Sequence, residues 1–277
     1  MPALLRVSVI LLILSALVSP CQAGKQLGSQ AHREDSRFSA EALAAFSKKV
    51  ERHAAKQGAR AFFLARLGMP ENELPKGITF THIGLAVYSE ISAQNASNAP
   101  GEETDQPQKK LYGYAIHNLY QDATTLNRSN LVQDYPMDFF AGVEKLKAGI
   151  VIPTPKLQQK LIAALEQGRF QSMHNANYSV IANPYTLKYQ NCTEHMLDFL
   201  FAAIYDTADM AQIKANQRAW FKAQRLDLSP FKQLLAATFT RDIYTLDHPD
   251  QLETATFDTI AHFLVSNGLA QPVEVIE

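Results

Sequence analysis

The chain has 277 residues with 26 Lys+Arg and 27 Asp+Glu, so its formal net charge is −1. Because there is no basic excess to neutralise phosphates, this composition argues against a nucleic-acid-binding protein. Two cysteines are too few for a disulfide-rich scaffold or a cysteine-only zinc site. The 47% hydrophobic and 19% charged content is typical of a globular protein.

The N-terminus predicts export. Arg6 precedes an uncharged apolar run at residues 7–18, and small residues follow it. This is the layout of a secretory signal, and the run is shorter than the ~20 residues that span a bilayer. We expect cleavage after Ala23 (signal peptide 1–23) and a periplasmic or secreted mature chain without a transmembrane span. Cys21 could instead carry a lipid anchor, but Pro20 before it disfavours that alternative.

Hydrophobic periodicity predicts an α+β protein: an N-terminal helical segment (24–60), a core (61–205) and a helical C-terminal extension of the same domain (206–277). Strands are expected at 61–67, 78–88, 111–120, 150–153 and 178–182. Helices are expected at 31–59, 155–168, 192–205, 211–224, 230–240 and 252–267. Residues 92–110 are polar with two prolines and predict a surface loop, while 129–142 predict an irregular segment or a capped helix.

The candidate chemistry centres on Cys192, which is the one cysteine left after signal cleavage. Asn191 is a predicted helix N-cap and Glu194 follows three residues later, a capping box that places Cys192 in the first helical turn. Free N–H groups and the helix dipole favour a thiolate there, and the Cys192 N–H could bind an oxyanion. Gln190 is a second candidate oxyanion donor.

Two histidines lie on predicted strands, each on the face that carries glycine and alanine. If a hairpin pairs Tyr88 with Leu111, His82 lies directly opposite His117. A thiol on a helix packed against that face would then complete a Cys192–His82–His117 triad of nucleophile, base and orienting group.

Two other side chains near His117 could orient His82 instead. They are Asn118, which is expected on the other face of its strand, and Tyr120. His195 lies at the edge of the apolar arc of its helix and is more typical of a structural histidine.

Several motifs resemble known families. Residues 81–88 (THIGLAVY) resemble the histidine strand of the circularly permuted NlpC-type, papain-like hydrolases, and residues 191–200 (NCTEHMLDFL) resemble their cysteine motif, as in the lecithin:retinol acyltransferase group. The order His82, His117, Cys192 matches that group. The segments YAIHNLY, SVIANPY and YQNCTEH resemble a secreted bacterial family classed as a domain of unknown function.

The resemblance implies a permuted papain-like core, in which an antiparallel sheet packs on the cysteine helix, with extra C-terminal helices. We therefore expect an exported cysteine hydrolase or acyl transferase that cleaves an amide or ester bond without a cofactor. The resemblance favours cell-wall peptide amides, such as those of peptidoglycan, over lipid-like acyl substrates.

Two alternatives stay open. One is a non-enzymatic envelope binding protein that uses the same cleft and has a vestigial triad. The other is a zinc site made by His82, His117 and Cys192, although no spaced carboxylate or second cysteine completes that set.

Overall fold

The computed structural model describes residues 36–91, 111–227 and 244–277. Its centre is a six-stranded antiparallel sheet with the strand order β4-β3-β2-β1-β5-β8. The strands are β1 (Ala61–Arg66), β2 (His82–Ile91), β3 (Leu111–Gln121), β4 (Ser129–Asp134), β5 (Ala148–Val151) and β8 (Glu274–Ile276). A two-stranded ribbon, β6 (Gln224–Arg225) and β7 (Glu253–Thr254), lies beside it.

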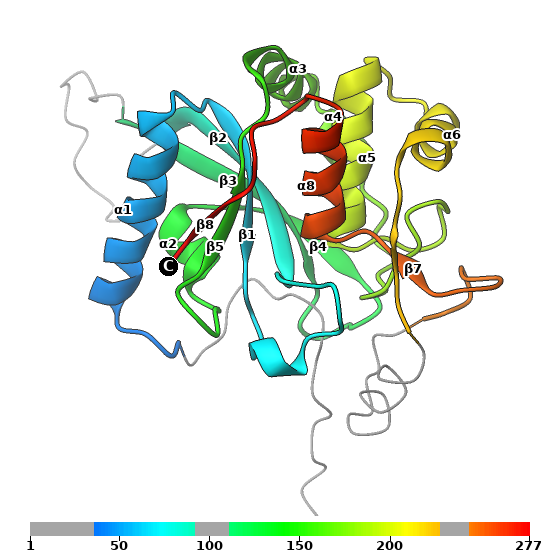
Figure 1. Cartoon of the computed structure of the whole chain (residues 1–277), viewed down its shortest axis with the longest axis horizontal. Coiled ribbons are helices and arrows are strands. Elements are labelled where there is room, and N and C mark those ends of the chain that lie inside the picture. Colours follow the sequence, from blue (N-terminus) through cyan, green and yellow to red (C-terminus); the bar gives the residue numbers. More distant parts are fainter. Residues whose placement is uncertain (1–35, 92–110, 228–243) are drawn as a thin grey trace, which may run out of the picture.

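Helices cover both faces of the sheet (Figure 1). One face packs on α1 (Ala40–Lys56) and α2 (Pro136–Phe140). The other packs on α3 (Pro155–Glu166), α4 (Arg169–Ser172), α5 (Cys192–Tyr205) and α8 (Phe257–Ser266), with α6 (Met210–Trp220) outside α5. A short 3-10 helix, η1 (Glu71–Glu73), precedes β2. No helix among the described residues is both long enough and apolar enough to cross a membrane.

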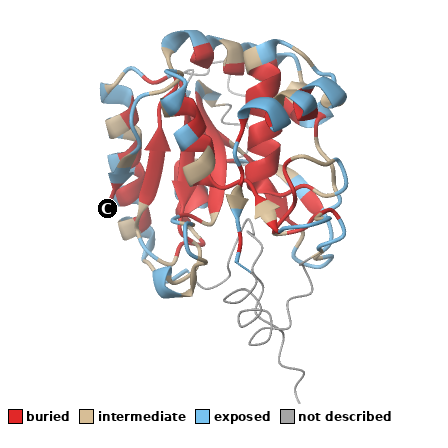
Figure 2. Ribbon diagram, turned by 45° about the vertical axis from the view of Figure 1, so that its right-hand side comes forward, coloured by how far each residue is buried: buried red, intermediate tan, exposed pale blue. Residues whose placement is uncertain are grey.

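Burial explains why the sheet is sandwiched. Every residue of β1 and β5 is buried, so these strands present apolar side chains to both layers, and Figure 2 shows the central strands in the buried class. Twelve of the 14 residues of α5 are buried as well. The sheet therefore covers the apolar side of α5, while α6 covers the side that carries Glu194 and Asp198.

Many predicted elements are confirmed within one or two residues, notably β1, β3, α3 and α5. One prediction is wrong and one is incomplete. Residues 178–182 form no ladder strand, only an isolated bridge between Tyr178 and Gln190. The segment 129–142 contains a capped helix, α2, as one of the two expectations had it, but also an edge strand, β4, which was not predicted because its polar residues pair with β3 through backbone hydrogen bonds that need no apolar pattern.

Other boundaries differ less. β2 begins at His82 and runs on to Ile91, and α8 begins at Phe257, after its N-cap Thr256. The expected signal peptide, the 92–110 loop and the 230–240 helix lie outside the described residues. The described part of the C-terminal extension, expected to be helical, also has three elements in sheets: β8 pairs with β5, and β7 pairs with β6.

Candidate active site

Cys192 is the first residue of α5. The Asn191 side chain accepts a hydrogen bond from the Glu194 N–H (2.9 Å), which confirms the predicted N-cap. The Asn191 amide also donates to the Val180 carbonyl (2.9 Å), which fixes the chain that enters the helix. The reciprocal half of the expected capping box does not form, because the Glu194 carboxylate bonds to Lys214 instead.

The environment of the thiol differs from the expectation of a thiolate. Cys192 is 5% exposed and lines a cleft. Burial raises the pKa of the Cys192 thiol to about 11, although hydrogen bonds with backbone N–H groups, chiefly that of Ile83, lower it. Desolvation therefore outweighs the helix N-terminus, and the protonated thiol is the resting form at neutral pH.

His82 lies on the other side of β2 from α5. Its ring is 1% exposed and stacks on Tyr120, with ring centroids 4.5 Å apart, and Phe139 of α2 lies 5.5 Å away. Burial, followed by the nearby Arg66 guanidinium, lowers the pKa of His82 well below its ordinary 6.5. The imidazole is therefore neutral at pH 7.

The hairpin register separates the two histidines. Leu111 pairs with Ile91, not with Tyr88, so His117 faces Leu85. The expected register was wrong because β2 continues to Ile91, whose side chain occupies the space over Gly113. A shift of three residues is odd, so it moves His117 to the opposite sheet face from His82.

On that face, the His117 ring contacts Phe170 at 5.7 Å between centroids. Burial lowers the pKa of His117 to about 4. With the two histidines on opposite faces, the structure assembles neither the His82–His117 pair nor the zinc set that requires both. Among the described residues, no group of three or more His, Cys, Asp or Glu side chains is arranged to hold a metal ion.

Asn118 occupies the place expected for His117. Its Oδ1 lies 3.1 Å from Nε2 of His82, while its Nδ2 donates to the Ile116 carbonyl (2.9 Å) and to Oδ2 of Asp134 (3.1 Å). Tyr120 donates to the same carboxylate oxygen (2.6 Å). Asp134 thus fixes both the amide that contacts the His82 ring and the phenol that stacks on it.

These contacts determine the tautomer of His82. Because both Asn118 amide hydrogens are used, its Oδ1 must accept, so Nε2 of His82 carries the proton and Nδ1 carries the lone pair. Nδ1 is buried and has no hydrogen-bond partner among the described atoms. The site therefore contains a neutral imidazole with a free basic nitrogen, next in sequence to the Ile83 N–H that contacts the thiol.

Gly84 is the residue in the sequence that could have indicated a side chain packed close to His82, which in the structure is Asn118. A Cβ on Gly84 would collide with Oδ1 of Asn118 and with the Ile116 side chain. The absence of a side chain at Gly84 leaves space for the Asn118 amide, whereas from the sequence we expected the cysteine helix to pack against this glycine.

Gln190 is held away from the thiol. Its Nε2 donates to the Met173 carbonyl (3.2 Å) and to Oδ2 of Asp198 (3.1 Å), and its Oε1 accepts from the Asn175 N–H (2.9 Å). Both amide hydrogens are used, so Gln190 is not available as an oxyanion donor. Of the two expected oxyanion donors, this leaves the N–H at the start of α5 as the candidate.

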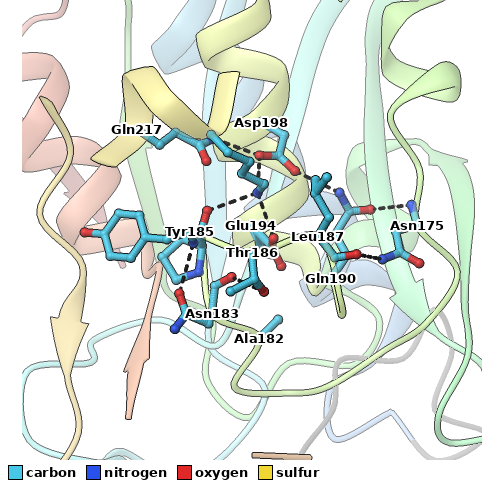
Figure 3. A network of polar contacts seen from close by, with 12 residues as sticks. Asn175, Ala182, Asn183, Tyr185, Thr186, Leu187, Gln190, Glu194, Asp198 and Gln217 are labelled. Atoms are coloured by element: carbon cyan, nitrogen blue, oxygen red, sulfur yellow. Dashed lines mark hydrogen bonds and ion pairs between the residues drawn. The ribbon is translucent and has the colours of Figure 1, made fainter. Parts of the chain in front are cut away.

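Gln190 belongs instead to a buried polar network between α5 and α6 (Figure 3). Its centre is the Lys214 ammonium, which donates to Asp198 (2.6 Å), Glu194 (2.9 Å) and the Pro184 carbonyl (3.0 Å). Gln217 also donates to Asp198 (2.7 Å). The network attaches the cysteine helix to α6 within two residues of the thiol.

His195 predicts an acid-sensitive fold. Its ring is fully buried, neither of its nitrogens is hydrogen-bonded to a described atom, and burial lowers its pKa to about 3. Below pH ~6.5 the histidine is protonated in the unfolded chain, whereas in the folded chain it stays neutral down to pH ~3. The contribution of the neutral His195 to the free energy of unfolding is therefore complete above pH ~6.5 and is lost as the pH falls. Urea unfolding at pH 7, 6 and 5 should show a decline on the order of 1 kcal/mol per pH unit from this group. His195→Leu should remove that part of the slope, and an unchanged slope would contradict the assignment.

The fold and the site define an α+β protein in which a cysteine at the start of a helix lies against a six-stranded antiparallel sheet. A buried His82–Asn118 pair lies on strands β2 and β3, on the opposite face of that sheet. Residues 53–264 match the model of a family described as an uncharacterized protein conserved in bacteria (DUF2145), and the chain belongs to that family. No curated protein and no solved structure matches the chain significantly.

Proposed function

We propose that the protein is an exported cysteine hydrolase or acyl transferase that acts on an amide or ester bond. Cys192 is the nucleophile, His82 is the general base through Nδ1, and Asn118 orients the imidazole. The observation that carries this proposal is the fixed His82 tautomer: Nε2 is tied to Asn118 and the unpartnered Nδ1 is the basic atom. The apolar run at residues 7–18 supports export.

The proposed reaction begins from a neutral pair. As the Cys192 sulfur forms a bond to the substrate carbonyl carbon, its proton passes to Nδ1 of His82. The N–H groups at the start of α5 stabilise the negative charge that develops on the carbonyl oxygen. His82 then gives the proton to the leaving amine or alcohol, and water or an acceptor nucleophile releases the acyl group.

Arg66 supports this order of events. Its guanidinium lies 5.5 Å from the Tyr120 ring centroid and 5.3 Å from that of Phe139, beside the His82 ring. A buried cation there opposes a resting imidazolium, so proton transfer accompanies attack rather than preceding it. Because the pKa of His82 lies well below 6.5 and that of Cys192 is about 11, acylation should vary little between pH 7 and 9.

A second candidate is an envelope binding protein that uses the same cleft without catalysis. The pKa of about 11 for Cys192 and the position of the His82 ring on the opposite face of β2 from α5 favour it. Catalysis through these residues requires the thiol, which contacts the Ile83 N–H one residue from His82, to reach Nδ1 past the start of β2 when substrate binds.

Acylation by an activated ester separates the two candidates. With p-nitrophenyl butyrate, the enzyme hypothesis predicts release of p-nitrophenol and an acyl adduct that peptide mass spectrometry assigns to Cys192. Cys192→Ala should abolish the adduct and reduce release to the uncatalysed rate. An unmodified Cys192 after prolonged incubation, or equal release by the Ala variant, would support the binding protein instead.

A further inference from the structure

The cleft beside Cys192 is built by four stretches of chain. They are the loop from Met69 to Thr81, the segment Tyr178–Ile181, the start of α5, and a wall formed by Leu226 with Thr254–Thr256. The last of these belongs to the C-terminal extension, beyond the expected core at 61–205. The extension therefore contributes one side of the cleft that leads to the thiol.

The described residues that line this cleft are uncharged. None of them is an acid or a base other than the weakly acidic Cys192 and Tyr178, and most are apolar. Ile78, Val180, Ile181 and Leu226 pack together with Leu252 as a separate apolar cluster. A carboxylate or ammonium group placed here would lose its hydration without gaining a partner, whereas an aliphatic group would gain from burial.

The size of the cleft limits what fits. Its volume is about 100 Å³. An apolar cavity of roughly 150 Å³ holds benzene, so this cleft accommodates a group smaller than that ring, of about four carbon atoms.

We infer that this cleft binds a short, uncharged aliphatic acyl group, with its carbonyl carbon at Cys192 and Leu226 determining the accepted length. The inference rests on the proposed function and names its substrate class. Such a group can be the aliphatic side chain of an aminoacyl residue or a short fatty acyl chain, which share this chemistry.

The test uses alkylation of Cys192, so it does not depend on turnover. Chloromethyl ketones R–CO–CH2Cl, in which R is methyl, butyl, decyl or 3-carboxypropyl, and N-acetyl-leucine chloromethyl ketone are reacted with the full chain at pH 9. Peptide mass spectrometry then gives the rate at Cys192, divided by the rate of the same reagent with the urea-unfolded chain. This ratio removes intrinsic differences between reagents.

We expect the butyl ratio to exceed the methyl ratio by up to about 60-fold, since butyl has three more methylenes and each buried methylene contributes about fourfold. The carboxypropyl and decyl ratios should each be at least about tenfold below the butyl ratio. A faster leucine reagent would identify the aminoacyl source, and a faster butyl reagent the fatty acyl source.

Leu226→Ala should move the optimum towards a longer chain, such as hexyl or octyl. Leu246→Ala is the matched control, because Leu246 is 75% exposed and lies outside the cleft lining. Equal ratios for all reagents, a preferred carboxypropyl reagent, or an unchanged optimum in Leu226→Ala would overturn the inference. The proposed function fails on a different result, an absence of ester acylation, so the two failures are distinguishable.

Discussion

Lys214→Met is expected to destabilise the protein by about 3–5 kcal/mol, because it leaves a buried carboxylate without its counter-ion. Lys214 is 3% exposed, and both Glu194 and Asp198 are 1% exposed. Although burial alone lowers the pKa of Lys214, the two carboxyls raise it above its ordinary value, so the ammonium stays charged. Burial raises the pKa of Glu194, which leaves Asp198, with hydrogen bonds from Gln190 and Gln217, as the counter-ion.

Urea unfolding at pH 7 measures this effect. Lys222→Met is the matched control, because Lys222 is exposed and the same substitution there should change stability by less than ~0.5 kcal/mol. Adding Asp198→Asn to Lys214→Met removes the uncompensated charge and should recover part of the loss. A Lys214→Met variant within ~1 kcal/mol of the wild type would contradict the role assigned to the network.

Much of the architecture could be predicted from local pattern. The N-cap at Asn191 and the 14-residue helix after it depend on neighbours in sequence, and both agree with the structure. The α+β class follows from the same periodicities. The β2–β3 register could not be predicted, because residues 92–110 separate the two strands in sequence, and no two-residue turn is present to fix the pairing. In the observed register the Ile91 side chain lies over Gly113.

The same register decides which side chain contacts His82. Cys192 and His82 supply the thiol and the imidazole of the proposed triad, and Asn118 replaces His117 as the proposed orienting group because the register differs from the expected one by an odd number of residues. The neutral thiol could not be predicted either, since the first turn of a helix indicates a lowered pKa while the depth of burial is a tertiary property. The role of Gln190 likewise depended on α6, which comes later in the chain.

The second large effect concerns the two residues on the imidazole side of the proposed triad. His82→Ala removes the proton acceptor, and acylation of Cys192 should slow by about 10²–10⁴-fold. Asn118→Ala keeps the imidazole but frees its ring and its tautomer, so a smaller loss of about 10–100-fold is expected, in the range seen when a positioning hydrogen bond is lost. His117 lies on the α5 face of the sheet, where its ring contacts Phe170, and the sheet separates it from His82, so His117→Ala should stay within about twofold of the wild type.

The measurement that tests the central claim most directly is the single-turnover rate at which p-nitrophenyl butyrate acylates Cys192 at pH 7 in the wild type and in His82→Ala, followed by intact mass. The account predicts that the variant is at least about 100-fold slower while its thermal unfolding remains cooperative. Equal acylation rates in a folded His82→Ala variant would contradict the assignment of His82 as the base that activates Cys192.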